Sequence, residues 1–276
     1  MDMISVLLIS FPAGLIGSLV GLGGATIMTP LLVAFGVPVK YAIAASMVTI
    51  IATSSGSASS YVKDRITNVR AAMYLEMFTI CGAILGATIT SYVAPRLLYF
   101  FFAAFLFTSF VGLRGRLRKE EIPTDVKQDR LAKWLKLEGS YYDKKLGKEV
   151  SYKLTRPALG GVGMFIAGIA AGMLGIGAGA FKVSIHELVL RMPSKVSSTT
   201  STFIIGMTAL AGASVYFASG MLYLGLAAPM AVGTTLGSLS GARLLNRFSN
   251  QRIRLLFLVV VFLLIVQMLY KGITAP

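Results

Sequence analysis

GLGGATIMTP occupies residues 21–30, and a looser copy of it, GIGAGAFKVS, occupies residues 175–184. Both copies place clustered glycines within long apolar runs, although glycine is among the residues that most weaken a helix. In hydrocarbon an unpaired backbone group is costly, so a helix can be broken only where protein or a water-lined cavity surrounds the break. The doubled cluster therefore predicts two broken helices that meet at one polar site.

The glycine clusters belong to a longer repeat. AGLIGSLVGLGGA from Ala13 aligns with AGIAAGMLGIGAG from Ala167, VPVKYAIAASM aligns with MPSKVSSTTST, and CGAILGA aligns with VGTTLGS. The repeat predicts a first membrane unit over residues 1–113 and a second over 157–276, joined by the charged connector 114–156.

Composition places both units in a membrane. The chain has 276 residues, of which 55% are hydrophobic and 13% are charged, whereas a soluble domain carries about a quarter charged residues. Apolar runs lie at 3–20, 25–37, 42–60, 71–93 and 97–113, and again at 157–175, 180–190, 196–218, 222–242 and 253–271. Most are long enough to span a bilayer of about 30 Å, but 25–37 and 180–190 are too short to do so comfortably.

The basic residues predict how the units are oriented. Half of the 26 Lys and Arg lie in the connector, and most of the rest occupy short gaps between apolar runs, as topology signals do. This distribution argues against nucleic acid as a partner, despite the net charge of +15. The basic gap is at 63–70 in the first unit, but in the second unit the gap at that position is uncharged and the basic residues lie at 243–254. The positive signal thus changes loops, which predicts inverted repeats.

We therefore expect an all-α polytopic membrane protein of about ten membrane segments. Each inverted repeat would contain a glycine-broken helical hairpin followed by three transmembrane helices. The connector, with a small hairpin in it, would be cytoplasmic, and both termini would lie on the outer face of a bacterial cytoplasmic membrane. A homodimer is compatible with the sequence, which does not determine the oligomeric state.

The glycine clusters are the first candidates for substrate binding. The N-terminus of a half-helix offers free N–H groups and a partial positive charge, so a site built from two of them favours an anion. Alternatively, glycines such as Gly14, Gly82 and Gly86 only let helices pack closely. The candidates around the two breaks are Gly21, Gly23, Gly24, Ala25, Thr26, Gly175, Gly177 and Gly179.

Three ionisable residues are further candidates. Lys182 lies in the short apolar run after the second break, where a lysine is costly unless it faces a cavity or a partner, although its long stem could also snorkel to the interface. Glu76 could carry a proton, pair with Lys182, or reach back to Arg70. His186 could serve proton coupling, but a position near a helix end at the cytoplasmic surface is the favoured interpretation.

Hydroxyl side chains are dense at equivalent positions of both units, in SMVTIIATSSGSASS (46–60) and SSTTST (197–202). Most of them are expected to bond their own helix backbone. Ser46, Thr49, Thr200 and Ser201 follow the breaks and are candidate donors to an oxyanion.

Other chemistries are excluded. The chain contains one cysteine, Cys81, and one histidine, His186, so no zinc site or nucleophile–base pair can be assembled, and we expect neither a metal, a cofactor nor an enzyme. GIGAG is not a phosphate-binding loop, because no strand precedes it and no GK[ST] follows it.

These motifs resemble the TauE/SafE family of anion exporters over nearly the whole chain. The resemblance is carried by GLGGATIMTPLL, VPVKYAIAASM, GIGAGAFKVSIHELVLRMPSKVSSTTS and the connector GSYYDKKLGKEVSYKLTR. It implies transport of sulfite, sulfoacetate or related organosulfonates across the bacterial cytoplasmic membrane. Lys182 matches the lysine of the family motif, whereas Ala178 and Ser184 replace a glycine and a proline that the family usually has, which puts the geometry of the second break in question.

The expected function is therefore secondary transport of a small sulfur-containing anion by alternating access, with export as the expected direction. No ATP motif is present, so an ion or substrate gradient would drive it. Two rival hypotheses share the topology: an anion channel, whose flux would not saturate, and a membrane assembly subunit that transports nothing.

Overall fold

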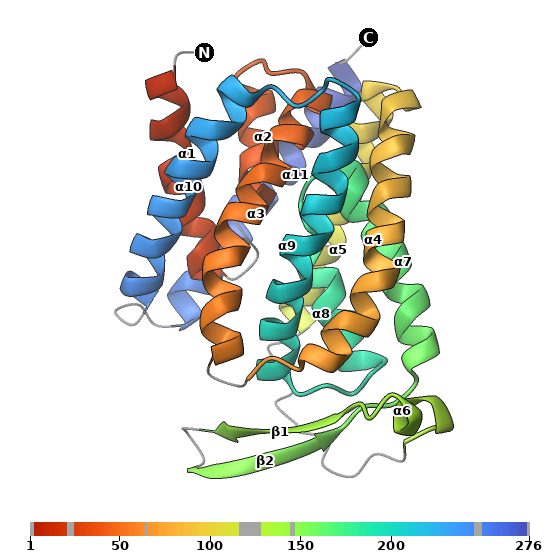
Figure 1. Cartoon of the computed structure of the whole chain (residues 1–276). Coiled ribbons are helices and arrows are strands. Elements are labelled where there is room, and N and C mark those ends of the chain that lie inside the picture. The colour runs from red at the N-terminus through yellow and green to blue at the C-terminus, as the bar shows by residue number, and fades with distance from the viewer. Residues whose placement is uncertain are drawn as a thin grey trace.

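The computed structural model describes residues 3–20, 25–63, 66–115, 128–143, 147–245 and 250–274, which form a bundle of helices above a small hairpin (Figure 1). The helices are α1 (Met3–Val20), α2 (Ala25–Ala34), α3 (Val39–Lys63), α4 (Val69–Tyr92), α5 (Pro95–Gly115), α6 (Arg130–Trp134), α7 (Pro157–Leu174), α8 (Gly179–Leu188), α9 (Ser194–Ala218), α10 (Leu224–Leu245) and α11 (Asn250–Thr274). Strands β1 (Glu138–Asp143) and β2 (Lys148–Lys153) pair in antiparallel fashion between α6 and α7. Gly21, Gly23, Gly24, Arg65, Arg247 and the connector residues 116–127 lie outside the described residues.

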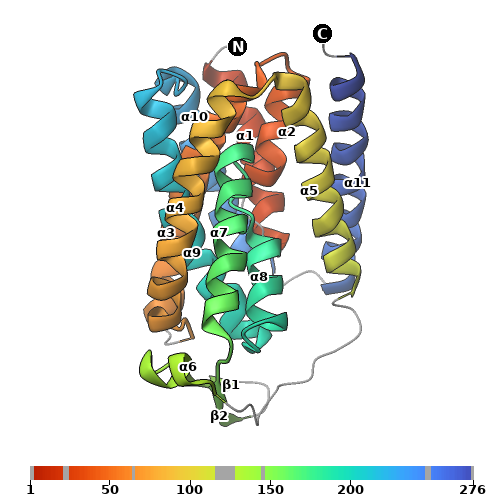
Figure 2. The same ribbon diagram turned by 90° about the vertical axis from the view of Figure 1, so that its right-hand side faces the viewer.

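Helices that are distant in the chain pack side by side. Helix α1 packs against α10, α4 against α7, and α3 against α9. Helices α5 and α11 form a further pair, which Figure 2 shows at one side of the bundle. Both termini lie at one end of the bundle and the hairpin lies at the other (Figures 1 and 2). The two halves of the chain are therefore interleaved rather than separate.

The outer surface of the bundle is apolar. By length and composition, α4, α7 and α9 could each cross a membrane, and shorter apolar helices lie within α1, α2, α3, α5, α10 and α11. Large side chains such as Met77, Leu159 and Leu210 are exposed on the surface. Exposed apolar area on this scale needs a cover in water, which a bilayer supplies. The fold is that of a helical membrane protein.

Glycines allow two of the helix pairs to approach closely. A Cβ atom on Gly82 of α4 would collide with the carbonyl oxygen of Phe165 on α7, and one on Gly14 of α1 would collide with Thr234 of α10. Gly86 lies one turn after Gly82 on the same face of α4, and a Cβ atom there would collide with the carbonyl oxygen of Ile169. The alternative interpretation of these glycines as packing residues is confirmed.

The hairpin is fastened to the helices through Asn68. The Asn68 Oδ1 atom accepts a hydrogen bond of 3.0 Å from the Ala71 N–H and so caps α4, and its Nδ2 donates one of 3.1 Å to the Tyr152 hydroxyl on β2. The Asn68 N–H donates to Thr200 Oγ1 on α9 at 3.2 Å. Burial raises the pKa of Tyr152 to about 12, an effect that the Asn68 donor opposes only in part. One asparagine thus joins α4, α9 and the hairpin.

Candidate functional site

The second glycine cluster breaks a helix inside the bundle. Helix α7 ends at Leu174, Gly175 and Gly177 have φ of +67°, and α8 begins at Gly179. Helix α8 has 10 residues and is about 15 Å long, half the thickness of a bilayer. It returns toward the end of the bundle at which α7 begins (Figure 2).

Ala178, which stands where the resembled family usually has glycine, has φ of +52°. This left-handed conformation costs an L-residue with a side chain about 1–2 kcal/mol. The chain therefore keeps the left-handed turn that starts α8, and alanine makes that turn under strain. The departure from the family motif does not remove the break.

Helices α3 and α9 cross over this break. A Cβ atom on Gly177 would lie 2.8 Å from Ile205 Cγ2 on α9 and 3.5 Å from Ile50 Cδ1 on α3, and one on Gly175 would lie 2.7 Å from the Ile43 carbonyl oxygen on α3. The break is thus held between two long helices that come from different halves of the chain. Its backbone is enclosed by protein, as a break within hydrocarbon requires.

Lys182 is the centre of a buried polar cluster. Its side chain is 0% exposed, and Nζ donates a hydrogen bond of 2.9 Å to Thr208 Oγ1 on α9. Thr208 Oγ1 lies 3.2 Å from Thr79 Oγ1 on α4, and Thr79 donates to the Glu76 carbonyl oxygen at 2.9 Å. The ammonium group does not reach the interface, so the snorkelling alternative for Lys182 is wrong.

Glu76 completes this cluster, although its carboxylate makes no direct ion pair with Lys182 among the described residues. The side chain is 3% exposed, its charge interacts with that of Lys182, and its Oε1 atom has no hydrogen-bond partner within the described part of the chain. Glu76 lies seven residues after Val69, the first residue of α4, and so about 10 Å along that helix from its start. An acceptor oxygen without a donor at this depth is expensive, which marks the cluster as more than packing.

His186 is fully buried one turn beyond Lys182. Its Nδ1 atom lies 3.4 Å from the Ser197 carbonyl oxygen on α9, and the Ser197 hydroxyl donates to the Val183 carbonyl oxygen at 3.3 Å. The expectation of a surface histidine near the helix end is wrong, because the α8–α9 connection and α9 cover it.

The second-half hydroxyls face different partners. The Ser201 hydroxyl donates to the Gly179 carbonyl oxygen at 3.4 Å and so lies beside the first turn of α8. Thr200 accepts from Asn68 at the start of α4 instead, away from the break. Of the two, Ser201 is therefore the one that the structure brings to Lys182's helix.

Residues 21–24, where the sequence predicts the first break, lie outside the described residues, but the helices on either side of them are described. Helix α1 ends at Val20 and α2 begins at Ala25; Ala25 and Thr26 are buried. Ser46 Oγ is buried and has no hydrogen-bond partner within the described ranges. Thr49 donates to the Ser46 carbonyl oxygen at 2.7 Å, which is the expected bond to its own helix. Ser46 and Thr49 occupy the stretch of α3 between Ile43 and Ile50, the two residues that contact the second break.

The two breaks differ in charge. In the alignment of the glycine clusters, Lys182 stands opposite Met28, which is also fully buried. Of these two equivalent positions, the one in the second half therefore carries an ammonium group and the one in the first half carries an apolar side chain. An anion held there would meet Lys182, the first N–H groups of α8 and the nearby hydroxyls.

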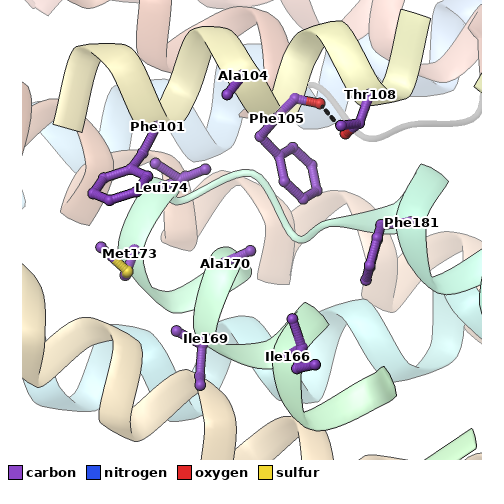
Figure 3. A pocket seen from close by; sticks show the side chains of 10 residues that line it. All are labelled: Phe101, Ala104, Phe105, Thr108, Ile166, Ile169, Ala170, Met173, Leu174 and Phe181. Carbon is purple, nitrogen blue, oxygen red and sulfur yellow. Dashed lines mark hydrogen bonds between the residues drawn. The ribbon is translucent and has the colours of Figure 1, made fainter. Parts of the chain in front are cut away.

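A cavity of about 340 Å³ lies between α5, α7 and α8 but offers no comparable groups (Figure 3). Phe101 and Phe105 line it from α5, and Phe181 lines it from α8. Its hydroxyl group, on Thr108, donates to the Phe105 carbonyl oxygen at 2.8 Å. An anion would find no free donor there, so we place the candidate site at Lys182 and not in this cavity.

Thr79 and Thr208 are members of the cluster that the sequence analysis missed. A signal for each exists in the spacing: Thr79 follows Glu76 by three residues, and Thr208 follows Ser201 by seven, so each pair shares a helix face. That signal is weak, because most hydroxyls in these helices bond only their own backbone.

The fold and this cluster define a class: an α-helical membrane protein with a broken helix and buried charges at the break, as in membrane transporters. The chain belongs to the family described as sulfite exporter TauE/SafE, whose sequence model matches residues 6–268. The resemblance inferred from the sequence is thereby confirmed.

Two curated relatives agree with this assignment. The "Probable membrane transporter protein YunE" of Bacillus subtilis (strain 168) is 23% identical over 281 residues, covering 99% of each chain. The "Probable membrane transporter protein YdhB" of the same organism is 25% identical over 242 residues, covering 87% of this chain and 89% of the relative. No solved structure matches the chain. The protein is a membrane transporter of this family.

Proposed function

We propose that this transporter carries a small sulfur-containing anion, such as sulfite, sulfoacetate or a related organosulfonate, and binds it at Lys182. The observation that carries the proposal is a fully buried lysine in the first turns of a half-helix, hydrogen-bonded at 2.9 Å to Thr208. Buried charges in a membrane protein mark substrate pathways, and an ammonium beside free helix N–H groups favours an anion. The family description and the sequence resemblance support the sulfur chemistry.

The proposed binding site draws on both breaks. In the second half it comprises Gly175, Gly177, Gly179, Lys182 and Ser201, and in the first half Gly21, Gly23, Gly24, Ala25, Thr26, Ser46 and Thr49. Thr200 would contribute indirectly, by holding α9 to the start of α4 through the hydrogen bond that it accepts from the Asn68 N–H. The approach of α3 to Gly175 and Gly177 supports a shared site, because Ser46 and Thr49 belong to the same stretch of α3.

The proposed architecture is two inverted repeats, residues 1–113 and 157–276, with about ten membrane segments and the connector 114–156 between them. The packing pattern supports this: α1 pairs with α10 as α7 pairs with α4. The opposite placement of the N-terminus and of the start of α7 in Figure 1 fits an inversion. The connector would face the cytoplasm and the termini the outer face of a bacterial inner membrane, by the distribution of basic residues.

Alternating access would then be a movement of one set of helices against the other around the broken segments, with export as the proposed direction. Because the second break is enclosed by α3 from the first half and α9 from the second, such a movement would expose the site to one side at a time. A homodimer is compatible with this mechanism and is not required by it.

The testing experiment is thermal unfolding of the purified protein with sulfite, sulfate, sulfoacetate, taurine, acetate and phosphate. A ligand present at about 100 times its Kd stabilises the folded state by about 2.7 kcal/mol. We expect a selective rise in Tm with a sulfur anion, its loss in Lys182→Met, and its retention in Lys153→Met on the exposed face of β2. No rise with any of the six, or an equal rise in Lys182→Met, contradicts the proposed site; saturable uptake into liposomes separates a transporter from a channel.

A further inference from the structure

Glu76 and Lys182 are buried opposite charges that interact without a direct ion pair. Glu76 is 3% exposed and Lys182 is 0% exposed. Two threonines connect the two residues, Thr79 on α4 and Thr208 on α9. Lys182 Nζ donates to the Thr208 hydroxyl, and the Thr208 hydroxyl lies 3.2 Å from that of Thr79, which is one turn after Glu76. Each charge acts on the other, and among the described residues the Lys182 ammonium is hydrogen-bonded to the Thr208 hydroxyl.

Helices α7, α9 and α3 pack against α4 and determine which other ionisable groups face Glu76. Helix α7, which packs closely on α4, carries no ionisable side chain. Helices α3 and α9 carry theirs near their ends, and Lys40 Nζ donates to the Ser91 carbonyl oxygen, far along α4 from Glu76. The ionisable residues on the facing or same elements are Arg70, Tyr74, Cys81 and Tyr92 on α4, Lys40, Tyr41, Tyr61 and Lys63 on α3, Lys195 and Tyr216 on α9, and Lys182, His186 and Glu187 on α8.

The net charge of the cluster limits which states are populated. With Glu76 ionised, Lys182 charged and no anion bound, the cluster is neutral. A singly charged anion bound alone leaves it with one negative charge, and a proton bound alone leaves it with one positive charge. Both of those states carry an uncompensated charge away from water, which is strongly unfavourable. Anion and proton bound together restore neutrality.

We infer that the transporter binds one proton together with each singly charged anion, and that this proton resides on the Glu76 carboxylate. This inference rests on the proposed anion site at Lys182. Glu76 suits the role because its buried Oε1 atom has no hydrogen-bond donor among the described residues, so its ionised form depends on the charge of Lys182. Once the anion binds Lys182, that stabilisation is shared, and the carboxylate takes up a proton from solvent.

Coupling of this kind has a functional consequence. Movement of a monoanion with a proton transfers no net charge, so the membrane potential neither drives nor opposes it. Direction then follows the gradients of the anion and of protons. The coupling ion of this transporter is thereby assigned to the proton.

The direct test measures proton uptake when an anion binds. Methanesulfonate is a suitable probe, because it is the anion of a strong acid and carries no proton itself. It is added to the full-length protein in weakly buffered detergent solution with a pH indicator, and binding is followed in parallel by calorimetry. We expect uptake approaching one proton for each anion bound, and an affinity that falls about tenfold per pH unit at the alkaline end.

Variants locate the proton. Glu76→Gln is neutral without a proton, so at a pH low enough to keep Lys182 charged it should bind methanesulfonate with no proton uptake and without that pH dependence. Glu138→Gln, at an exposed position on β1, is the matched control and should behave like the natural protein. Binding without proton uptake in the natural protein, or uptake that persists in Glu76→Gln, overturns the inference while the anion site stands; loss of uptake only in His186→Asn assigns the proton to His186 and also overturns it. Failure of methanesulfonate to bind the natural protein contradicts the anion site itself.

Discussion

The ammonium group of Lys182 donates a hydrogen bond of 2.9 Å to the hydroxyl of Thr208, and this bond joins the half-helix α8 to the long helix α9. Thr208 is fully buried and lies 3.2 Å from Thr79 of α4. Three helices from both halves of the chain therefore meet at a single positive charge. A movement of α8 relative to α9 or α4 would have to break or rearrange this contact, so the contact opposes such a movement.

Thr208→Val removes the acceptor of Lys182 and keeps the shape of the side chain. A buried polar group left without its partner costs about 1–3 kcal/mol, and a charged one costs more. We expect a fall in Tm of the purified protein that reflects at least this loss. Thr202→Val on the same helix is the control, because Thr202 donates only to the Ser198 carbonyl oxygen at 3.0 Å. Equal effects of the two substitutions would contradict a special role for Thr208.

Gly177→Ala should weaken the fold more than an alanine at an open position of similar backbone conformation. Gly177 has φ of +67°, and a Cβ atom there would lie 2.8 Å from Ile205. Gly147 has φ of +62° with nothing within 4 Å of a Cβ atom. Gly147→Ala thus carries only the left-handed penalty of about 1–2 kcal/mol, whereas Gly177→Ala adds a steric clash at the break. Thermal unfolding of both variants measures the difference, and a difference of zero would show that the break tolerates a side chain.

Ala178→Gly should stabilise the protein. Ala178 adopts φ of +52°, and glycine removes the left-handed strain of about 1–2 kcal/mol while adding about 0.5–1 kcal/mol of chain entropy to be lost on folding. The expected net gain is up to about 1.5 kcal/mol, seen as a higher Tm. Ala211→Gly, within the regular helix α9, should have the opposite sign, since glycine weakens a helix interior by about 1 kcal/mol. A lower Tm for Ala178→Gly would mean that the side chain contributes packing that outweighs its strain.

The Tyr152 contact should fail at alkaline pH. Burial raises the pKa of Tyr152 from 10.0 to about 12, so the folded protein keeps the phenol proton to a higher pH than the unfolded chain does. The resulting stabilisation is fully present below pH 10 and is lost as pH rises through about 12. In Tyr152→Phe this part of the alkaline loss should be absent, and the lost bond to Asn68 should cost about 1 kcal/mol at neutral pH.

Tyr142→Phe is the control for this comparison, because Tyr142 is exposed on the neighbouring strand β1. Unfolding of the three proteins is followed at pH 8 and at several values between 10 and 12. If Tyr142→Phe and Tyr152→Phe flatten the alkaline loss equally, the buried phenol is not its source.

Local features of the amino-acid sequence predicted the kind of protein and the location of its second break. Helix length, apolar composition and glycine placement are local properties, and they were enough to predict a helical membrane protein and the interrupted segment at Gly175 and Gly177, and to single out Lys182 as a candidate. The family motif in the sequence likewise led to the TauE/SafE assignment.

Which side chains meet depends on how the helices pack against one another. Thr79, Thr208 and Glu76 converge on Lys182 because α4, α8 and α9 pack together, and no local periodicity specifies contacts between helices so far apart in the chain. For the same reason Thr200, which the sequence groups with Ser201, turns out to accept from Asn68 at the start of α4. The burial of His186 also depends on the neighbouring α9, since the sequence shows where a helix ends but not what covers that end.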